Sequence, residues 1–295
     1  MSISQRTLAI GLLFLVLLSS PHAVHSQDRP LEKSKELPKE IVSAWVDAGG
    51  EWGGIQTNDF GFVRFVSAKQ LTGNEMPAFS FRKAPKRRLG ELPPIEQPFG
   101  LWLQAGWINS ETLTDVAAMK HLQALHLGYV ALTPERAKLV AASETIRALD
   151  LQQAVFESGV MKELAALKSL RSLDVSNTYL RDAQLSELAE LSQLRCFRMT
   201  YTKATADGIK ELAALKELEA LDLSCSAVSD ESLAGMTGLK QLKKLNLQQT
   251  AVSDAAVKSL VEFKELENLD VFGSKVTTQG VREIRKSLPK IKIQF

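Results

Sequence analysis

Large apolar residues recur at one fixed interval along most of the chain. Positions 24 residues apart, without an insertion or deletion, are all apolar: Leu125, Leu149, Leu173, Phe197, Leu221, Leu245, Leu269 and Ile293. A constant period of about 20 to 50 residues is typical of stacked supersecondary units that share one continuous core. The pattern therefore predicts a solenoid of repeated units rather than a single globular core.

Each period contains a strand pattern followed by a helix pattern. Around Leu221 the residues alternate between apolar and polar, which is typical of a strand. In the helical part of the preceding unit, the apolar residues Ile209, Leu212 and Leu215 recur at every third position. Because each strand–helix unit returns to the same side, successive strands are expected to be parallel. Acidic residues three positions before the helical runs are expected to be helix N-caps, namely Asp182, Asp230 and Asp254.

Three strand segments show the repeat most clearly, Leu218–Leu223, Leu242–Leu247 and Leu266–Val271. They resemble the leucine-rich repeat, with Thr or Ser where many versions carry Asn or Cys. The Thr-x-Val-Ser-Asp run at Thr250–Asp254 is similar to repeat proteins that are abundant in planctomycete-type bacteria. The resemblance implies an α/β solenoid with a parallel β-sheet on its concave face and helices on its convex face. It also implies a binding or interaction scaffold.

The chain divides into four segments. Residues 1–26 are interpreted as a secretory signal, because Arg6 precedes the apolar run Leu8–Leu18, which is shorter than the roughly 20 residues that a membrane span needs. An uncleaved N-terminal anchor is the alternative. Residues 27–38 are a polar linker, 39–98 an N-terminal α/β cap with an irregular connector, and 99–295 the leucine-rich repeat domain.

Within the cap, a helix is expected over Lys39–Ala48, opened by Pro38 and ended by two glycines. A strand is expected over Gly61–Val66 and a short one over Ala78–Phe81, within an otherwise irregular stretch. The cap is needed because a terminal repeat leaves an apolar face and a strand edge in water. In the second repeat, Pro134, Ala137 and Ser143 depart from the pattern and predict a loose helix.

Charge and cysteine content exclude several classes of function. The chain has 36 basic and 34 acidic residues, so it is nearly neutral, and nothing indicates a nucleic-acid partner.

Cys196 and Cys225 lie in adjacent repeats at positions offset by five residues, too far apart for a disulfide, and are expected to be free thiols. No catalytic motif, metal-ligand set or cofactor-binding loop is present, so we expect no enzymatic activity, no metal and no cofactor.

Candidate binding residues project from the concave face beside the inward leucines. They are Trp102, His126, Asp150, Asp174, Arg198 and Asp222. The neighbouring column is small in its first half: Gly100, Ala124, Ala148, Ser172 and Cys196.

The pair Asp150 and Asp174 lies on adjacent strands, about 4.8 Å apart. These carboxylates are either solvated or compensated by a cation, a ligand or an arginine such as Arg147, Arg171 or Arg195. Trp102 and His126 are expected either to form an aromatic lip with Tyr129 or to pack under the connector.

The pattern as a whole favours an exported, non-enzymatic and monomeric recognition module that binds a protein or glycan on its concave face. After signal cleavage it has no membrane span and is periplasmic or extracellular. The alternative is a structural spacer of the cell envelope.

Overall fold

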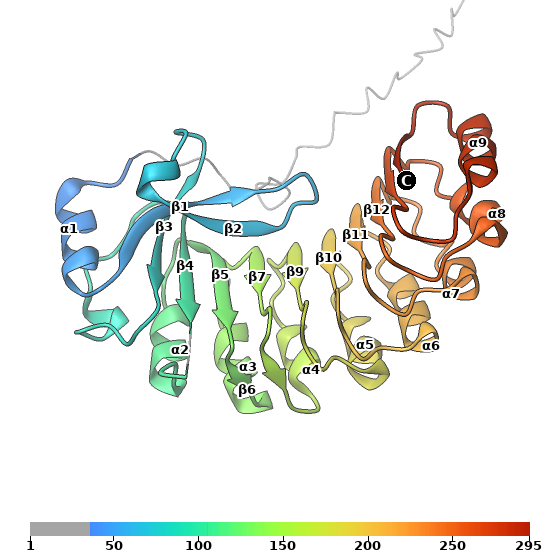
Figure 1. Cartoon of the computed structure of the whole chain (residues 1–295). Coiled ribbons are helices and arrows are strands. Elements are labelled where there is room, and N and C mark those ends of the chain that lie inside the picture. The colour runs from blue at the N-terminus through green and yellow to red at the C-terminus, as the bar shows by residue number, and fades with distance from the viewer. Residues whose placement is uncertain (1–35, 105) are drawn as a thin grey trace, which may run out of the picture.

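A computed structural model describes residues 36–104 and 106–295. The described part is an arc whose inner side is lined by strands and whose outer side carries helices (Figure 1). The predicted signal and most of the linker lie outside the described residues. Among the described residues, no helix is both long and apolar enough to cross a bilayer.

The repeat strands form the greater part of one 12-stranded sheet within the described chain. They are β4 (Phe99–Gln104), β5 (Leu122–Gly128), β7 (Ala148–Asp150), β9 (Ser172–Asp174), β10 (Cys196–Arg198), β11 (Ala220–Asp222), β12 (Lys244–Asn246), β13 (Asn268–Asp270) and β14 (Lys292–Gln294). A separate two-stranded sheet joins β6 (Ala131–Leu132) to β8 (Val155–Phe156).

The convex side is built from short helices. They are α2 (Ser110–Ala117), α3 (Pro134–Ala141), α4 (Val160–Leu164), α5 (Asp182–Leu188), α6 (Ala206–Lys210), α7 (Asp230–Gly235), α8 (Val257–Leu260) and α9 (Thr278–Ser287).

The predicted period and register are confirmed. Leu221 pairs in parallel with Phe197 on one side and Leu245 on the other, and the same register continues from Leu101 to Ile293. Leu221 and its two neighbours are fully buried. The repeated apolar residues therefore form one continuous core between sheet and helices.

The predicted helix caps are wrong in one respect: the acidic residues are the first helical residues, not the caps. Ser229 is the N-cap of α7, and Asp230 follows it. Asp230 instead reaches into the next repeat, where its carboxylate accepts the backbone N–H of Ser253 at 2.7 Å and its hydroxyl at 2.6 Å. The equivalent pairs are Asp182 with Thr205 and Asp254 with Thr277. Each aspartate thus holds the capping residue of the following helix in place.

The loose helix expected in the second repeat is also wrong. Helix α3 is regular over Pro134–Ala141, and the hydroxyl of Thr133 accepts the backbone N–H of Arg136. Proline suits the first turn of a helix because its φ is already helical and its missing N–H is not needed there. Ala137 is fully buried and Ser143 is buried, its hydroxyl lying within hydrogen-bond distance of Thr145 Oγ1.

The cap continues the repeat sheet. Its helix α1 (Lys39–Asp47) is confirmed, and its strands are β1 (Glu51–Thr57), β2 (Val63–Ser67) and β3 (Met76–Phe81). Strand β3 pairs in parallel with β4, whereas β1 lies antiparallel to both β3 and β2. The sequence did not predict β1, because Gly53 and Gly54 interrupt its pattern. A Cβ atom on Gly53 would lie 2.1 Å from the carbonyl oxygen of Val66, so the close strand pairing requires glycine.

Candidate functional site on the concave face

The candidate residues form one continuous row across the sheet. Cα pairing joins Trp102 to His126, His126 to Asp150, and Asp150 to Asp174. The row continues through Arg198 to Asp222. Adjacency of these residues is therefore as predicted.

Most of this row is buried, which the sequence did not predict. His126, Asp150, Asp174 and Asp222 expose between 1% and 6% of their surface, and Trp102 is half-buried. The chain itself covers this part of the concave face. Of the two arrangements left open for Trp102, packing under another segment is the one found, although the covering segment is not the connector.

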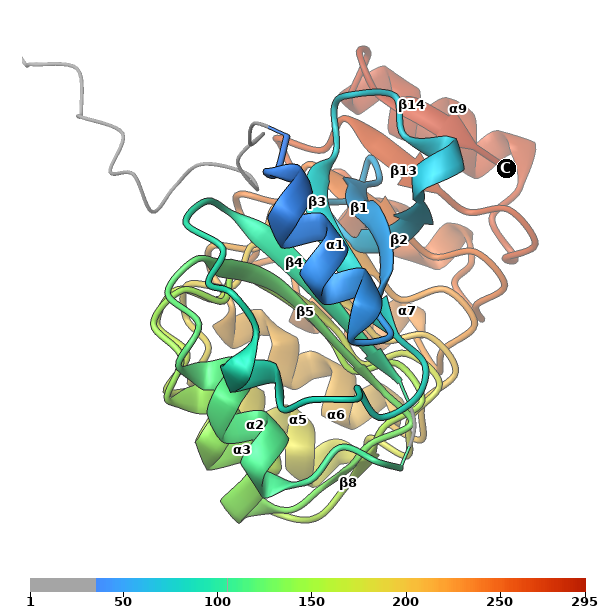
Figure 2. The same ribbon diagram turned by 90° about the vertical axis from the view of Figure 1, so that its left-hand side faces the viewer.

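The cover is the hairpin formed by β1 and β2. It extends from the cap along the inner side of the arc, over the early repeat strands (Figures 1 and 2). Ile55 and Val63 of the hairpin form a buried apolar cluster with Ala124 and Ala148. A Cβ atom on Gly100 would lie 2.6 Å from Ile55. The column of small residues therefore makes room for the hairpin, and it was the available sequence signal for it.

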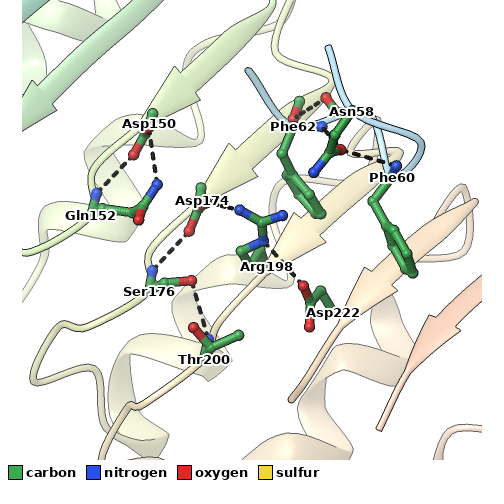
Figure 3. Close-up of polar contacts among 12 residues, drawn as sticks. Asn58, Phe60, Phe62, Asp150, Gln152, Asp174, Ser176, Arg198, Thr200 and Asp222 are labelled. Carbon is green, nitrogen blue, oxygen red and sulfur yellow. Dashed lines mark hydrogen bonds and ion pairs between the residues drawn. The ribbon is translucent and has the colours of Figure 1, made fainter. Parts of the chain in front are cut away.

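The turn of the hairpin is fastened to the later strands. The side-chain oxygen of Asn58 accepts the backbone N–H groups of Phe60 and Phe62, both at 3.0 Å, which shapes the turn (Figure 3). Gly61, at a φ of 82°, presents its carbonyl oxygen to the hydroxyl of Ser172 at 3.1 Å. The ammonium group of Lys244 donates to the carbonyl oxygen of Asp59.

Arg198 connects the row to the hairpin. Its guanidinium donates to Asp174 at 3.0 Å and to Asp222 at 3.1 Å, and it lies over the ring of Phe62 at 4.1 Å from the centroid (Figure 3). Compensation of the acidic pair by an arginine was one of the alternatives that the sequence left open, with Arg147, Arg171 and Arg195 as the candidates. Arg198, within the row itself, compensates Asp174.

The aspartates of the row have a local structural role. The Oδ1 atom of Asp150, Asp174 and Asp222 accepts in each case the backbone N–H two residues later, at 2.9 to 3.1 Å. Asn246 and Asp270 do the same in later repeats. Asp and Asn are suited to such turns because their short side chains reach their own backbone. The recurrence of the sequence Leu-Asp-Leu in the repeats is therefore explained by the turn that its aspartate shapes, and no ligand is needed to explain it.

Burial changes the acidity of this row. It raises the pKa of Asp174 from 3.8 to about 6; the neighbouring Asp150 carboxylate adds to the rise, and Arg198 opposes it. His126 stacks on Trp102 with centroids 3.9 Å apart. Its Nδ1 atom lies 3.0 Å from Asp150 Oδ2, but neither ring nitrogen is aligned with a hydrogen-bond partner among the described residues. His126 is therefore held by packing against Trp102, with its Nδ1 atom beside the Asp150 carboxylate.

The two cysteines are free, as predicted. Cys196 lies beneath Gly61: a Cβ atom added to Gly61 would lie 3.5 Å from the Cβ atom of Cys196. Burial, followed by the negative charge of Glu219, raises the pKa of the Cys196 thiol to about 11. The reactive thiolate form is thus disfavoured at neutral pH. No group of three or more His, Cys, Asp or Glu side chains in the described chain is arranged to hold a metal ion.

Beyond the hairpin, the concave face is more accessible. We call this region the open concave surface and define it by residues of β12, β13 and β14, the hairpin turn and one adjoining loop. Its residues are Lys244, Asn246, Asn268, Asp270, Lys292, Gln294, Phe60 and Phe272. All are half-buried or exposed, and Phe272 exposes 48% of its surface.

A family model described as a leucine-rich repeat region matches residues 106–294. The chain belongs to the leucine-rich repeat family. Among solved structures, this leucine-rich repeat protein is similar to internalin C2 of Listeria monocytogenes, with 17% identity, a TM-score of 0.49, and coverage of 86% of this chain and 92% of that one.

It is also similar to a second internalin of Listeria monocytogenes, with 18% identity and a TM-score of 0.46 over 66% of this chain. The match spans 60% of the length of that internalin. No match is found among curated proteins.

Proposed function

We propose that the protein is an exported, non-enzymatic recognition module that binds a protein partner with its open concave surface. The single observation that carries this proposal is the division of the concave face. The hairpin covers Trp102, His126 and Asp150, whereas the residues of β12–β14 remain accessible. The predicted binding region is therefore moved toward the C-terminal repeats.

The chemistry of the open concave surface suits a protein. Lys244, Lys292 and Asp270 supply both signs of charge, and Phe60 and Phe272 supply apolar area at its margin. Aromatic residues with a polar surround are typical of protein interfaces. Leucine-rich repeat domains commonly mediate protein binding, which supports the same class of partner.

The absence of an enzymatic role is supported by how the polar side chains of the row are used. Asp174 and Asp222 bind Arg198 and their own turns, and the thiol of Cys196 is buried. A cysteine nucleophile needs an accessible thiolate and an adjacent base.

The proposal of export is based on the apolar run that follows Arg6. An exported protein would meet its partner in the periplasm or outside the cell.

Capture of partners from an extract of the source cell tests the proposal. Asn268→Arg and Lys292→Glu are expected to weaken capture of the same protein at least tenfold, because both side chains lie on the open concave surface. Lys286→Glu, on the exposed side of α9, is the matched control and is expected to leave capture unchanged. Equal capture by all three variants would contradict the proposal.

The spacer alternative is favoured by one observation, the burial of the predicted binding row under the hairpin. A spacer needs no accessible concave site. It predicts that substitutions of the open concave surface leave every captured protein unchanged, while substitutions of the convex helices, for example at Lys210 or Glu211, alter assembly.

A further inference from the structure

The three tyrosines of the chain all lie on one rim of the solenoid. Tyr129, Tyr179 and Tyr201 expose 61%, 67% and 63% of their surface and follow β5, β9 and β10. The short strands β6 and β8 belong to the same rim, and they are labelled near the bottom of Figure 1 and of Figure 2, respectively. Exposed aromatic residues that gather on one surface mark an interaction site.

The backbone under two of these tyrosines is strained. Tyr129 and Tyr201 have φ values of 61° and 52°, in the left-handed region that a bulky residue rarely adopts. The equivalent turn has the same conformation in the other repeats, where it is occupied by Gln153, Asn177, Cys225, Gln249 and Gly273. The conformation therefore belongs to the repeat. What distinguishes Tyr129 and Tyr201 is that this turn holds their aromatic rings largely in solvent, where they can contact a molecule outside the chain.

The rim is also depleted of charge. It comprises six equivalent segments of four residues, 128–131, 152–155, 176–179, 200–203, 224–227 and 248–251, which we call the tyrosine rim. Lys203 is the one charged residue in these segments, although 24% of the chain is charged. The remaining polar side chains are amides and hydroxyls, with the thiol of Cys225. The open concave surface, in contrast, contains several charges.

We propose that the tyrosine rim binds a neutral polysaccharide laid across the repeats. Aromatic rings offer flat faces for the apolar faces of sugar rings, and Gln153, Asn177 and Gln249 offer both hydrogen-bond donors and acceptors. Successive turns repeat at about the strand spacing of 4.8 Å, so Tyr129 and Tyr201, three strands apart, are separated by about 14 Å along the rim. A linear polymer of short, regular units can follow such a row, whereas an anionic polymer would lack basic partners.

The hydroxyl of Tyr201 interacts with the thiol of Cys225 in the next repeat, and this contact raises the pKa of the tyrosine. A side chain that already contacts a neighbour loses less conformational entropy when a ligand binds.

Affinity gel electrophoresis of the full chain tests this proposal. The gels contain laminarin, hydroxyethyl cellulose or dextran as neutral probes, and alginate or heparin as charged probes. At least one neutral polysaccharide is expected to retard the protein, and the retardation is expected to be the same at low and high salt because no charge pairs form.

Two substitutions are expected to reduce the affinity about tenfold each, Tyr129→Ala and Tyr201→Asn, since each removes one stacking surface. Asparagine tolerates the left-handed turn, so the second variant separates loss of binding from loss of folding. Tyr179→Phe keeps the ring and is expected to bind nearly as the parent does. Phe295→Ala removes an exposed aromatic ring two strands beyond the last segment of the rim and is the matched control.

Three results would overturn the proposal: no retardation by any neutral probe, retardation by the anionic probes alone, and equal losses in Phe295→Ala and the rim variants. The rim variants are also expected to capture the protein partner of the open concave surface normally. If they instead lose that capture while binding no polysaccharide, the rim is a protein interface and the polysaccharide proposal is wrong.

Discussion

At the residue scale, Asp174 shows how burial converts a candidate ligand into a structural group. Its carboxylate accepts the backbone N–H of Ser176 and pairs with Arg198, while the hairpin excludes water. The sequence predicted its position on the sheet and its closeness to Asp150. It did not predict its burial, because nothing in the strand itself reveals what lies above it.

The pH dependence of stability follows from this burial. The folded-state pKa of Asp174 is about 6, above its ordinary value of 3.8, so the folded protein binds this proton more tightly than the unfolded chain. The resulting stabilisation is complete below about pH 4 and is lost as the pH rises through about 6. Asp174→Asn is expected to remove this loss and to raise the free energy of unfolding near pH 7 by on the order of 2 kcal/mol relative to the parent.

Urea denaturation of parent and variant between pH 4 and pH 7 measures this effect. The difference between the two proteins is the relevant quantity, because the pKa of Glu75 is lowered to about 2 and gives a pH dependence of the opposite sign. A difference that does not change with pH would show that Asp174 is not the titrating group.

The neighbouring residues Leu221 and Asp222 of β11 are both expected to contribute to stability. Leu221→Ala is expected to reduce the free energy of unfolding by about 2 to 5 kcal/mol through lost burial and a cavity. Asp222 is buried and bound to both Arg198 and Ser224, so Asp222→Ala is expected to reduce it by about 1 to 3 kcal/mol rather than negligibly. Denaturant titration of both variants tests this, and a neutral Asp222→Ala would contradict the ion pair.

At the element scale, the repeats are joined by contacts that the periodic pattern only partly reveals. The period placed every repeat strand in register, since the inward apolar residues alone determine that alignment. The same pattern placed Asp230 correctly near a helix start. It assigned the carboxylate to the cap of that helix, whereas the carboxylate binds Ser253, the N-cap of the helical segment in the next repeat. Strand β1 was not predicted, since its glycines serve a close pairing that only the folded cap displays.

The hydrogen bonds between an aspartate of one repeat and the capping residue of the next, such as Asp230 and Ser253, form a ladder between repeats. One pair of variants tests this ladder. Asp230→Ala is expected to reduce the free energy of unfolding by about 1 to 2 kcal/mol, because Ser253 loses two acceptors near the start of its helical segment. Asp207→Ala is the control: it removes an exposed ion pair with Lys210 and is expected to have an effect of about half a kcal/mol or less. Equal thermal and denaturant stabilities of the two variants would contradict the ladder.

At the scale of the whole molecule, the concave face of the arc has a covered part and an accessible part. The cap sheet continues into the repeat sheet, and its hairpin then turns back over the N-terminal half of the concave face. That arrangement leaves the C-terminal half as the accessible concave surface and the tyrosine rim as a second, uncharged surface. The small residues from Gly100 to Cys196 were visible in the sequence, but their purpose depends on a contact between segments more than a hundred residues apart.

The most direct test of this arrangement is a disulfide between the hairpin turn and the sheet. In a Cys225→Ser background, Gly61→Cys places a Cβ atom about 3.5 Å from the Cβ of Cys196, within the range for a disulfide, and the bond has to form against the strain of a φ of 82° at position 61. Mild oxidation is expected to link the two positions, as measured by intact mass and peptide mapping, in a protein that remains folded and still captures its partner. If the two thiols remain free in the folded variant, and Cys196 of the parent reacts with a thiol-specific reagent as fast in the folded protein as in the unfolded chain, the hairpin does not cover the concave face and the account is wrong.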